Sequence, residues 1–203
     1  INNSKTDYQF GNPFTVWDEN GPNADWEGRP EGAPFFAMFS FNLTHESALF
    51  QPGLINAAGE AVAQNAVLAE SQRRLLSHRT PPRDVEVPPY YPDTQTVREE
   101  IARQYDNVQL MDVWVGERMK ELEQAGLLEN TIVIWTTDHG DGLPRAKRSL
   151  YDSGLKVPMI IRFPDGRSAG SVDDGLISFI DLAPTLLALA GVDVPSHLKG
   201  RNI

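Results

Sequence analysis

Cysteine is absent from the 203 residues of this chain. The chain can therefore form no disulfide bond, no thiolate metal site and no cysteine nucleophile of its own. Long apolar runs are missing as well, because no stretch approaches the roughly 20 residues that a membrane-crossing helix needs. The first residues also lack the charged and then apolar pattern of a secretory signal. The sequence thus predicts neither thiol chemistry nor a membrane-spanning helix within this segment.

Positive charge is scarce, since 28 acidic residues outnumber 18 basic ones and give a formal net charge of −10. This balance argues against general binding to nucleic acid or to an anionic membrane, because both require a basic face. Its simplest interpretation is a solubilising surface. If the substrate is an anion, a few local cations must attract it, which draws attention to Arg145, Lys147 and Arg148.

Three segments have the character of helices. Apolar residues recur at steps of three and four over 99–124, the pattern of an amphipathic helix. An alanine-rich segment with few breakers predicts a second helix over 54–78. A compact third helix is expected to end at Gly191, with Ser178 or Asp181 as its cap.

Strand-like runs alternate with these helices. Aromatic or β-branched residues of strand length lie at 34–42, 131–135 and 157–163. The first 34 residues are expected to form an irregular loop, and 80–95 an extended one. Strands that alternate with helices predict an α/β sheet that is covered on both faces.

The strand predicted at 131–135 breaks abruptly into TTDHGDG. Asp138 offers a hard oxygen and neutral His139 a nitrogen, and both suit a divalent cation. Gly140 and Gly142 add the backbone freedom that lets a loop approach a ligand. The alternative is a loop aspartate that caps a turn beside a hydrogen-bonding histidine. Spacing alone leaves metal binding and turn capping equally open.

The other candidate residues carry little weight individually. Lys147 could hold an oxyanion, or it could be a solvated surface lysine. His45 follows the aromatic run, and it could act as a general acid or be a satisfied core histidine. Lys5 stands in a polar loop that by itself indicates no function.

Taken together in order, four blocks resemble the formylglycine-dependent sulfatases of the alkaline phosphatase superfamily, over nearly the whole chain. The aromatic strand ending in a histidine is matched by PFFAMFSFNLTH, and the passage from helix to metal loop by VPPYYPDTQTVREE through TIVIWTTDHGDG. The lysine segment with its strand is matched by AKRSLYDSGLKVPMIIRFP, and the late helix by ISFIDLAPTLLALAG. The resemblance implies a three-layer α/β/α fold, alkaline-phosphatase-like, with a mainly parallel sheet and the site at the carboxyl ends of its strands.

The resemblance also implies roles for individual residues. Asp138 would bind a divalent cation, usually calcium, with His139 where many members have an asparagine. Lys147 would clamp a sulfate oxygen, and His45 would protonate the leaving alcohol. Lys5 would face both the nucleophile and the sulfate, although its surroundings, NNSKTDYQF, depart from the commonest form of that motif.

One part of the family pattern has no counterpart in the chain. Members attack sulfur with a formylglycine made from cysteine or serine in the motif Cys/Ser-x-Pro-x-Arg, and no serine of this chain begins that motif. An early aspartate pair that would complete the cation site is not recognisable either. Residues 1–203 are therefore expected to be a sulfatase-like catalytic domain without its N-terminal nucleophile segment, inactive alone and completed by that segment.

The expected function is that of a sulfuric ester hydrolase acting on a sulfated small molecule or glycan, plausibly a carbohydrate, with no nucleic acid or membrane partner. The resemblance favours a periplasmic or secreted location. Two alternatives stay open. The first is a phosphate or phosphonate ester hydrolase of the same superfamily, for which an Asp-His metal pair is at least as natural. The second is a catalytically silent protein that grips sulfated glycans.

Overall fold

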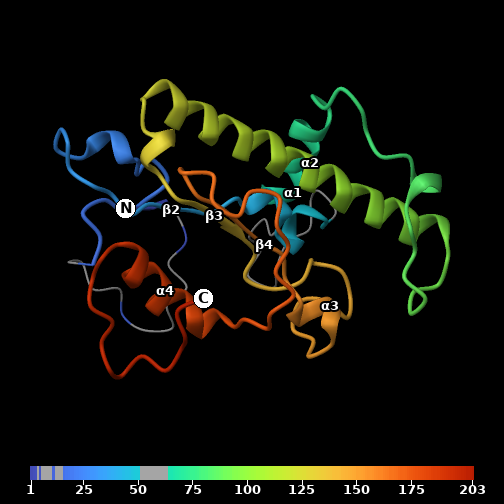
Figure 1. Ribbon diagram of the computed structural model, residues 1–203. Helices are drawn as coiled ribbons and strands as arrows, with labels where there is room; N and C mark the ends of the chain where they lie inside the picture. Colours follow the sequence, from blue (N-terminus) through green and yellow to red (C-terminus); the bar gives the residue numbers. More distant parts are fainter. Residues whose placement is uncertain (4, 6–10, 12–15, 51–63) are drawn as a thin grey trace. The chain divides into compact units, whose positions relative to one another are not determined.

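Helix α2 (Gln95–Gln124) is the longest element in the computed structural model, which describes residues 1–3, 5, 11, 16–50 and 64–203 (Figure 1). It begins four residues before the predicted start because the Thr94 side chain accepts a hydrogen bond from the Val97 amide and caps it. Its buried Ile101 packs with Val85 in the main apolar cluster. None of the helices that the structure describes is long and apolar enough to cross a bilayer.

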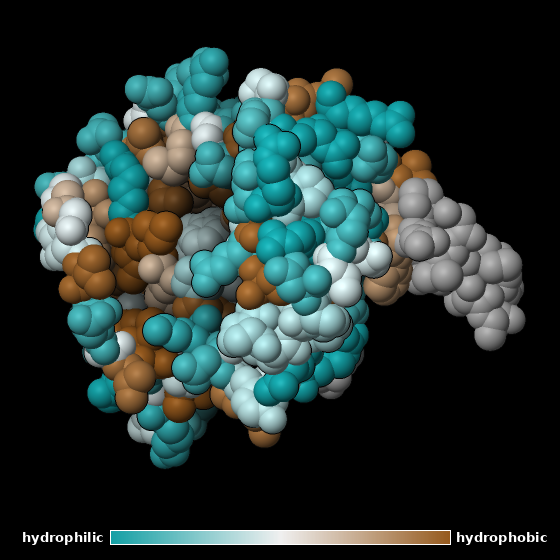
Figure 2. Space-filling model, turned by 90° about the vertical axis from the view of Figure 1, so that its right-hand side faces the viewer, coloured by the Kyte–Doolittle hydropathy of each residue, from teal (hydrophilic) through white to brown (hydrophobic). Residues whose placement is uncertain are grey.

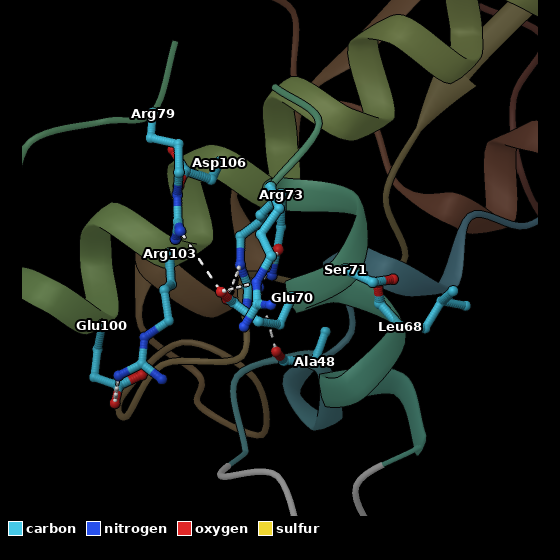
Figure 3. Close-up of polar contacts among 11 residues, drawn as sticks. Ala48, Leu68, Glu70, Ser71, Arg73, Arg79, Glu100, Arg103 and Asp106 are labelled. Atoms are coloured by element: carbon cyan, nitrogen blue, oxygen red, sulfur yellow. Dashed lines mark hydrogen bonds and ion pairs between the residues drawn. The ribbon is translucent and has the colours of Figure 1, made fainter. Parts of the chain in front are cut away.

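Helix α1 (Gln64–Arg73) packs against α2 through a polar network (Figure 3). Arg73 is 3% exposed, pairs with Glu70 at 2.9 Å and donates to Asn107 Oδ1 at 2.7 Å. Arg79 pairs with buried Asp106 at 3.0 Å. These contacts offset the desolvation of buried charges, which is unfavourable without partners. The predicted helix over 54–78 is confirmed for its middle part, and residues 54–63 lie outside the described residues.

Four short strands form two pairs in the described part of the chain. Strand β1 (Asn2–Asn3) runs parallel to β2 (Met38–Phe39), with Asn2 opposite Met38. Strand β3 (Val133–Thr136) pairs with β4 (Met159–Arg162), as the runs at 131–135 and 157–163 predicted. The β-branched side chains of the 131–135 run suggest a buried strand, but the residues of β3 are only half-buried, because a single strand flanks it.

The aromatic run at 34–42 forms less strand than expected. Only two of its residues join β2, because its rings pack against two tryptophans. Trp26 stacks on Phe35 at 6.0 Å between ring centroids and meets Phe39 edge-on at 5.5 Å. Trp114 of α2 contacts Phe41 at 5.4 Å. This aromatic cluster fixes the course of the chain as it approaches His45.

The chain divides into two compact units, residues 1–161 and 162–203. The second unit contains helix α4 (Leu182–Leu189), preceded by a short 3₁₀ turn (Phe179–Asp181). Ser178 and Asp181, the two predicted caps, form a capping box on this turn, and Asp181 is the N-cap of α4 but makes no side-chain cap bond to it. The Asp181 carboxylate also accepts the amide of Arg201 at 2.7 Å, and this bond and the Ser178 amide lower the pKa of Asp181. All sequence-predicted site residues belong to the first unit.

Candidate active site

His45 lies between two short 3₁₀ turns, Asn42–Thr44 and Glu46–Ala48. Its Nδ1 is 2.8 Å from the Ser47 hydroxyl oxygen, which also accepts a hydrogen bond from the Asn65 side chain at 2.9 Å. Arg73 donates to the carbonyl of Ala48 at 3.5 Å. Helix α1 therefore holds the turn that carries His45 at two points.

Lys147 meets this histidine from a segment 102 residues away, with its Nζ 3.0 Å from Nε2 of His45. The other ring nitrogen, Nδ1, accepts the backbone amide of Ser47 at 3.2 Å and also faces the Ser47 hydroxyl. Partial burial and then the charge of Lys147 lower the pKa of His45. Both effects favour the neutral form of the imidazole.

Glu46 joins the histidine turn to the lysine loop. Its carboxylate accepts two hydrogen bonds from the Arg148 guanidinium, at 2.6 and 2.7 Å, and its Oε1 lies 3.5 Å from Lys147 Nζ. The Arg148 hydrogen bonds lower the pKa of Glu46 to about 2, with the charge of Lys147 contributing further. A forked pair of this kind fixes orientation as well as distance. Glu46 therefore ties the histidine turn to the loop that carries Lys147.

Asp138 and His139 lie just beyond β3, as predicted. Asp138 Oδ2 is 2.5 Å from Lys5 Nζ, although 133 residues separate the two in sequence. Burial opposes ionisation of Asp138, but the hydrogen bond and charge of Lys5 outweigh it and lower its pKa. His139 Nδ1 is 2.6 Å from the Gly140 carbonyl, so it donates there and leaves the lone pair on Nε2, 3.5 Å from Asp138 Oδ1. One carboxylate oxygen and one imidazole nitrogen thus converge.

The two glycines of this loop allow close approach by the chain itself. A Cβ on Gly140 would lie 1.8 Å from the carbonyl oxygen of Ser153, and one on Gly142 would lie 2.5 Å from the Cα of Glu46. The Gly140 amide also donates to the Gly154 carbonyl at 3.1 Å. The glycines therefore let residues 138–142 pack between the histidine turn and the segment around 153.

A divalent cation would find an incomplete set of ligands here. Within the described ranges, no three His, Asp or Glu side chains are arranged to hold a metal ion. Asp138 Oδ1 and His139 Nε2 nevertheless fit as two neighbouring donors, and the Lys5 ammonium shows that the carboxylate attracts positive charge. Carboxylate oxygen suits calcium, whereas an imidazole nitrogen is more typical of transition metals.

A sequence model described as Sulfatase matches residues 22–192. The chain belongs to the sulfatase family. This membership brings with it the alkaline-phosphatase-like α/β fold, and it confirms the resemblance seen in the sequence.

Three relatives illustrate the range of this sulfatase family. The chain is 44% identical to an ulvan-active sulfatase of Formosa agariphila and 32% identical to N-sulphoglucosamine sulphohydrolase of Homo sapiens, over 98% and 84% of its own length. It is 37% identical to an N-acetylglucosamine-6-O-sulfatase of Bacteroides thetaiotaomicron over 46% of its length and 17% of that protein. The chain spans 36% of the length of each of the first two relatives.

The structure of this sulfatase chain adds residues that the sequence analysis did not single out. Ser47 and Asn65 orient the ring of His45, and Glu46 holds Lys147. Glu46 could have been noticed as the acidic neighbour of His45, with a basic run elsewhere to pair with it. Asn65 gave no such signal, because one asparagine in an alanine-rich helix is indistinguishable from a solvated one.

Proposed function

We propose that the chain is the later part of the catalytic domain of a sulfuric ester hydrolase that removes sulfate from a sulfated carbohydrate. The Lys147–His45 contact carries this proposal, since it joins a cation for an oxyanion to a proton-transferring ring. The named relatives support the substrate class, because they act on ulvan, N-sulphoglucosamine and N-acetylglucosamine 6-sulfate by their names. None of these names favours a phosphate ester hydrolase or a silent glycan-binding protein.

Each cation has a distinct task in this proposal. Lys147 binds a sulfate oxygen and balances the charge that develops as the ester bond breaks. Lys5 approaches the sulfate from the Asp138 side and adds a second positive charge. Both act at short range against the overall charge of −10, which would repel an anionic substrate.

His45 is the candidate acid for the leaving alcohol. It needs a proton on Nε2, which the charge of Lys147 disfavours while the site is empty of anions. A bound sulfate compensates this charge, and so it raises the affinity of His45 for the proton. Substrate binding thereby prepares the acid, while Ser47 keeps the ring oriented.

Two groups outside this chain complete the site in the proposal. Asp138 and His139 would hold a divalent cation, for which calcium is the family's usual choice, and this cation would polarise the sulfate. The formylglycine of the family would supply the nucleophile from an N-terminal segment of the same protein. In that complete protein, β3 and β4 would belong to the mainly parallel sheet at the centre of a three-layer α/β/α fold.

The test is turnover of an aryl sulfate and the matching aryl phosphate by the complete protein and its Lys147→Ala variant. We expect the sulfate to be the better substrate and its kcat to fall at least about 100-fold, because a fixed charge at a developing oxyanion contributes that much. Lys120→Ala, on an exposed face of α2, is the matched control and should retain turnover. Equal rates for the two variants, or faster phosphate hydrolysis, would contradict the proposal.

A further inference from the structure

The loop that presents Lys147 also places a second cation, Arg145, between two aromatic rings. The Arg145 guanidinium carbon lies 5.0 Å from the ring centroid of Tyr90 and 4.5 Å from that of Tyr151. Cation–π contacts with two rings hold the guanidinium in place beside both tyrosines. Arg145 is therefore a preoriented donor two residues before Lys147.

The backbone at Arg145 supports this interpretation. Its φ angle is 67°, in the left-handed region that non-glycine residues rarely adopt. The Ser153 hydroxyl donates to its carbonyl, and the neighbouring Tyr91 hydroxyl donates to the carbonyl of Pro144. An unfavourable conformation that surrounding contacts maintain is typical of functional positions.

The guanidinium has no acidic partner in the described part of the chain, where no carboxylate lies within ion-pair distance of Arg145. Arg148, three residues on, is by contrast paired with Glu46 through both of its terminal nitrogens. In a chain of net charge −10, an oriented and unpaired guanidinium is suited to an anionic group from outside.

The surroundings of Arg145 fit a sugar. A depression of about 410 Å³ is lined by Tyr90, Arg145, Leu150, Tyr151, Asp152 and Ser153. Leu150 and Tyr151 are 87% and 60% exposed and offer apolar surface, while Asp152 and Ser153 offer acceptors for hydroxyl groups. Figure 2 shows the side on which the N-terminal end of α2 lies in Figure 1, and hydrophilic and hydrophobic residues adjoin on this face.

We propose that Tyr90, Arg145 and Tyr151 form a subsite for a second, anionic sugar unit, adjacent to the unit whose sulfate ester is cleaved. The carboxylate or second sulfate of that unit binds the Arg145 guanidinium, and its ring packs on Tyr151 and Leu150. This inference rests on the proposed sulfatase function and extends it, because it makes the substrate an oligosaccharide with at least two charged units.

The experiment compares two substrates in the complete protein, 4-nitrophenyl sulfate and ulvan tetrasaccharides, for the variants Arg145→Ala and Tyr151→Ala. Each variant should lose about ten-fold more kcat/KM on the tetrasaccharide than on the aryl sulfate. This extra loss should appear mainly in KM, because it corresponds to one lost charge-assisted contact. Arg83→Ala removes an equally charged side chain that is 84% exposed, and it should show no such difference. Equal losses on both substrates would overturn the subsite.

Tetrasaccharides with their carboxylates reduced to alcohols identify the anion. If Arg145→Ala and the wild-type protein then have the same kcat/KM on the reduced tetrasaccharide, the carboxylate is the group that Arg145 binds. If the variant still has the lower kcat/KM, the second sulfate is that group. Should the complete protein cleave neither substrate, the sulfatase proposal fails, and calorimetric binding of the tetrasaccharide still tests the subsite. A dissociation constant about ten-fold weaker for Arg145→Ala supports the subsite, and an unchanged one refutes it.

Discussion

Replacing Glu46 by Gln removes the charge that joins the histidine turn to the lysine loop. The Glu46 pKa of about 2, against an ordinary 4.5, corresponds to about 3.5 kcal/mol at about 1.4 kcal/mol per pKa unit. The Arg148 side chain is 67% exposed, so solvent screening reduces the contribution to about 1 to 2 kcal/mol. Because the folded-state pKa is the lower one, this stabilisation is complete above pH 4.5 and is lost as the pH falls toward 2.

The assay is urea unfolding of the complete protein, followed by tryptophan fluorescence between pH 3 and pH 7. Glu46→Gln should lower the free energy of unfolding by about 1 to 2 kcal/mol at pH 7, and the two proteins should converge toward pH 3. Asp165→Asn is the control, since Asp165 is 57% exposed and its 3.7 Å pair with Arg167 should contribute less than about 0.5 kcal/mol. A difference that is the same at every pH would refute the reasoning, because it could not come from the ionised carboxylate.

Two further predictions concern the loops. Gly140→Ala should destabilise the protein by about 1 to 3 kcal/mol and reduce aryl sulfate turnover, because its Cβ would overlap the Ser153 carbonyl. Gly116→Ala on α2, where a Cβ meets nothing within 4 Å, should instead be neutral or slightly stabilising, and equal effects at both sites would contradict the packing argument. Asp181→Ala should speed tryptic cleavage after Lys199 and Arg201, because the Asp181 carboxylate holds the Arg201 amide. Unchanged cleavage rates on mass spectrometry would show that this bond does not restrain the segment.

Local patterns in the sequence predicted most of the elements that position the site. The step of three and four residues located α2, because a helix that buries one face repeats its apolar residues with the helical period. The β-branched runs located β3 and β4, and the break after β3 marked Asp138 and His139. The aromatic run at 34–42 predicted a longer strand than the structure has, because its rings pack on Trp26 and Trp114 instead of extending a sheet.

Local sequence patterns could not predict the contacts between side chains that form the site. Lys147 and His45 are 102 residues apart, and Lys5 and Asp138 are 133 residues apart. Whether such side chains meet depends on how helices and loops pack, which no short window of sequence contains. The role of Glu46 could not be predicted for the same reason. Its partner Arg148 is 102 residues away in sequence, and the two meet because Gly142 packs closely against the backbone of Glu46.

The sequence by itself determined the family, the main helix, the paired strands and the residue types available for catalysis, because each of these is written in local order and spacing. Only the tertiary structure decided which side chains meet: that Lys147 faces His45, that Glu46 lies beside Lys147, and that Arg145 lies against two tyrosines. The physical reason is that ion pairs and stacked rings act over a few ångströms, and distances that short between remote residues exist only once the chain has packed.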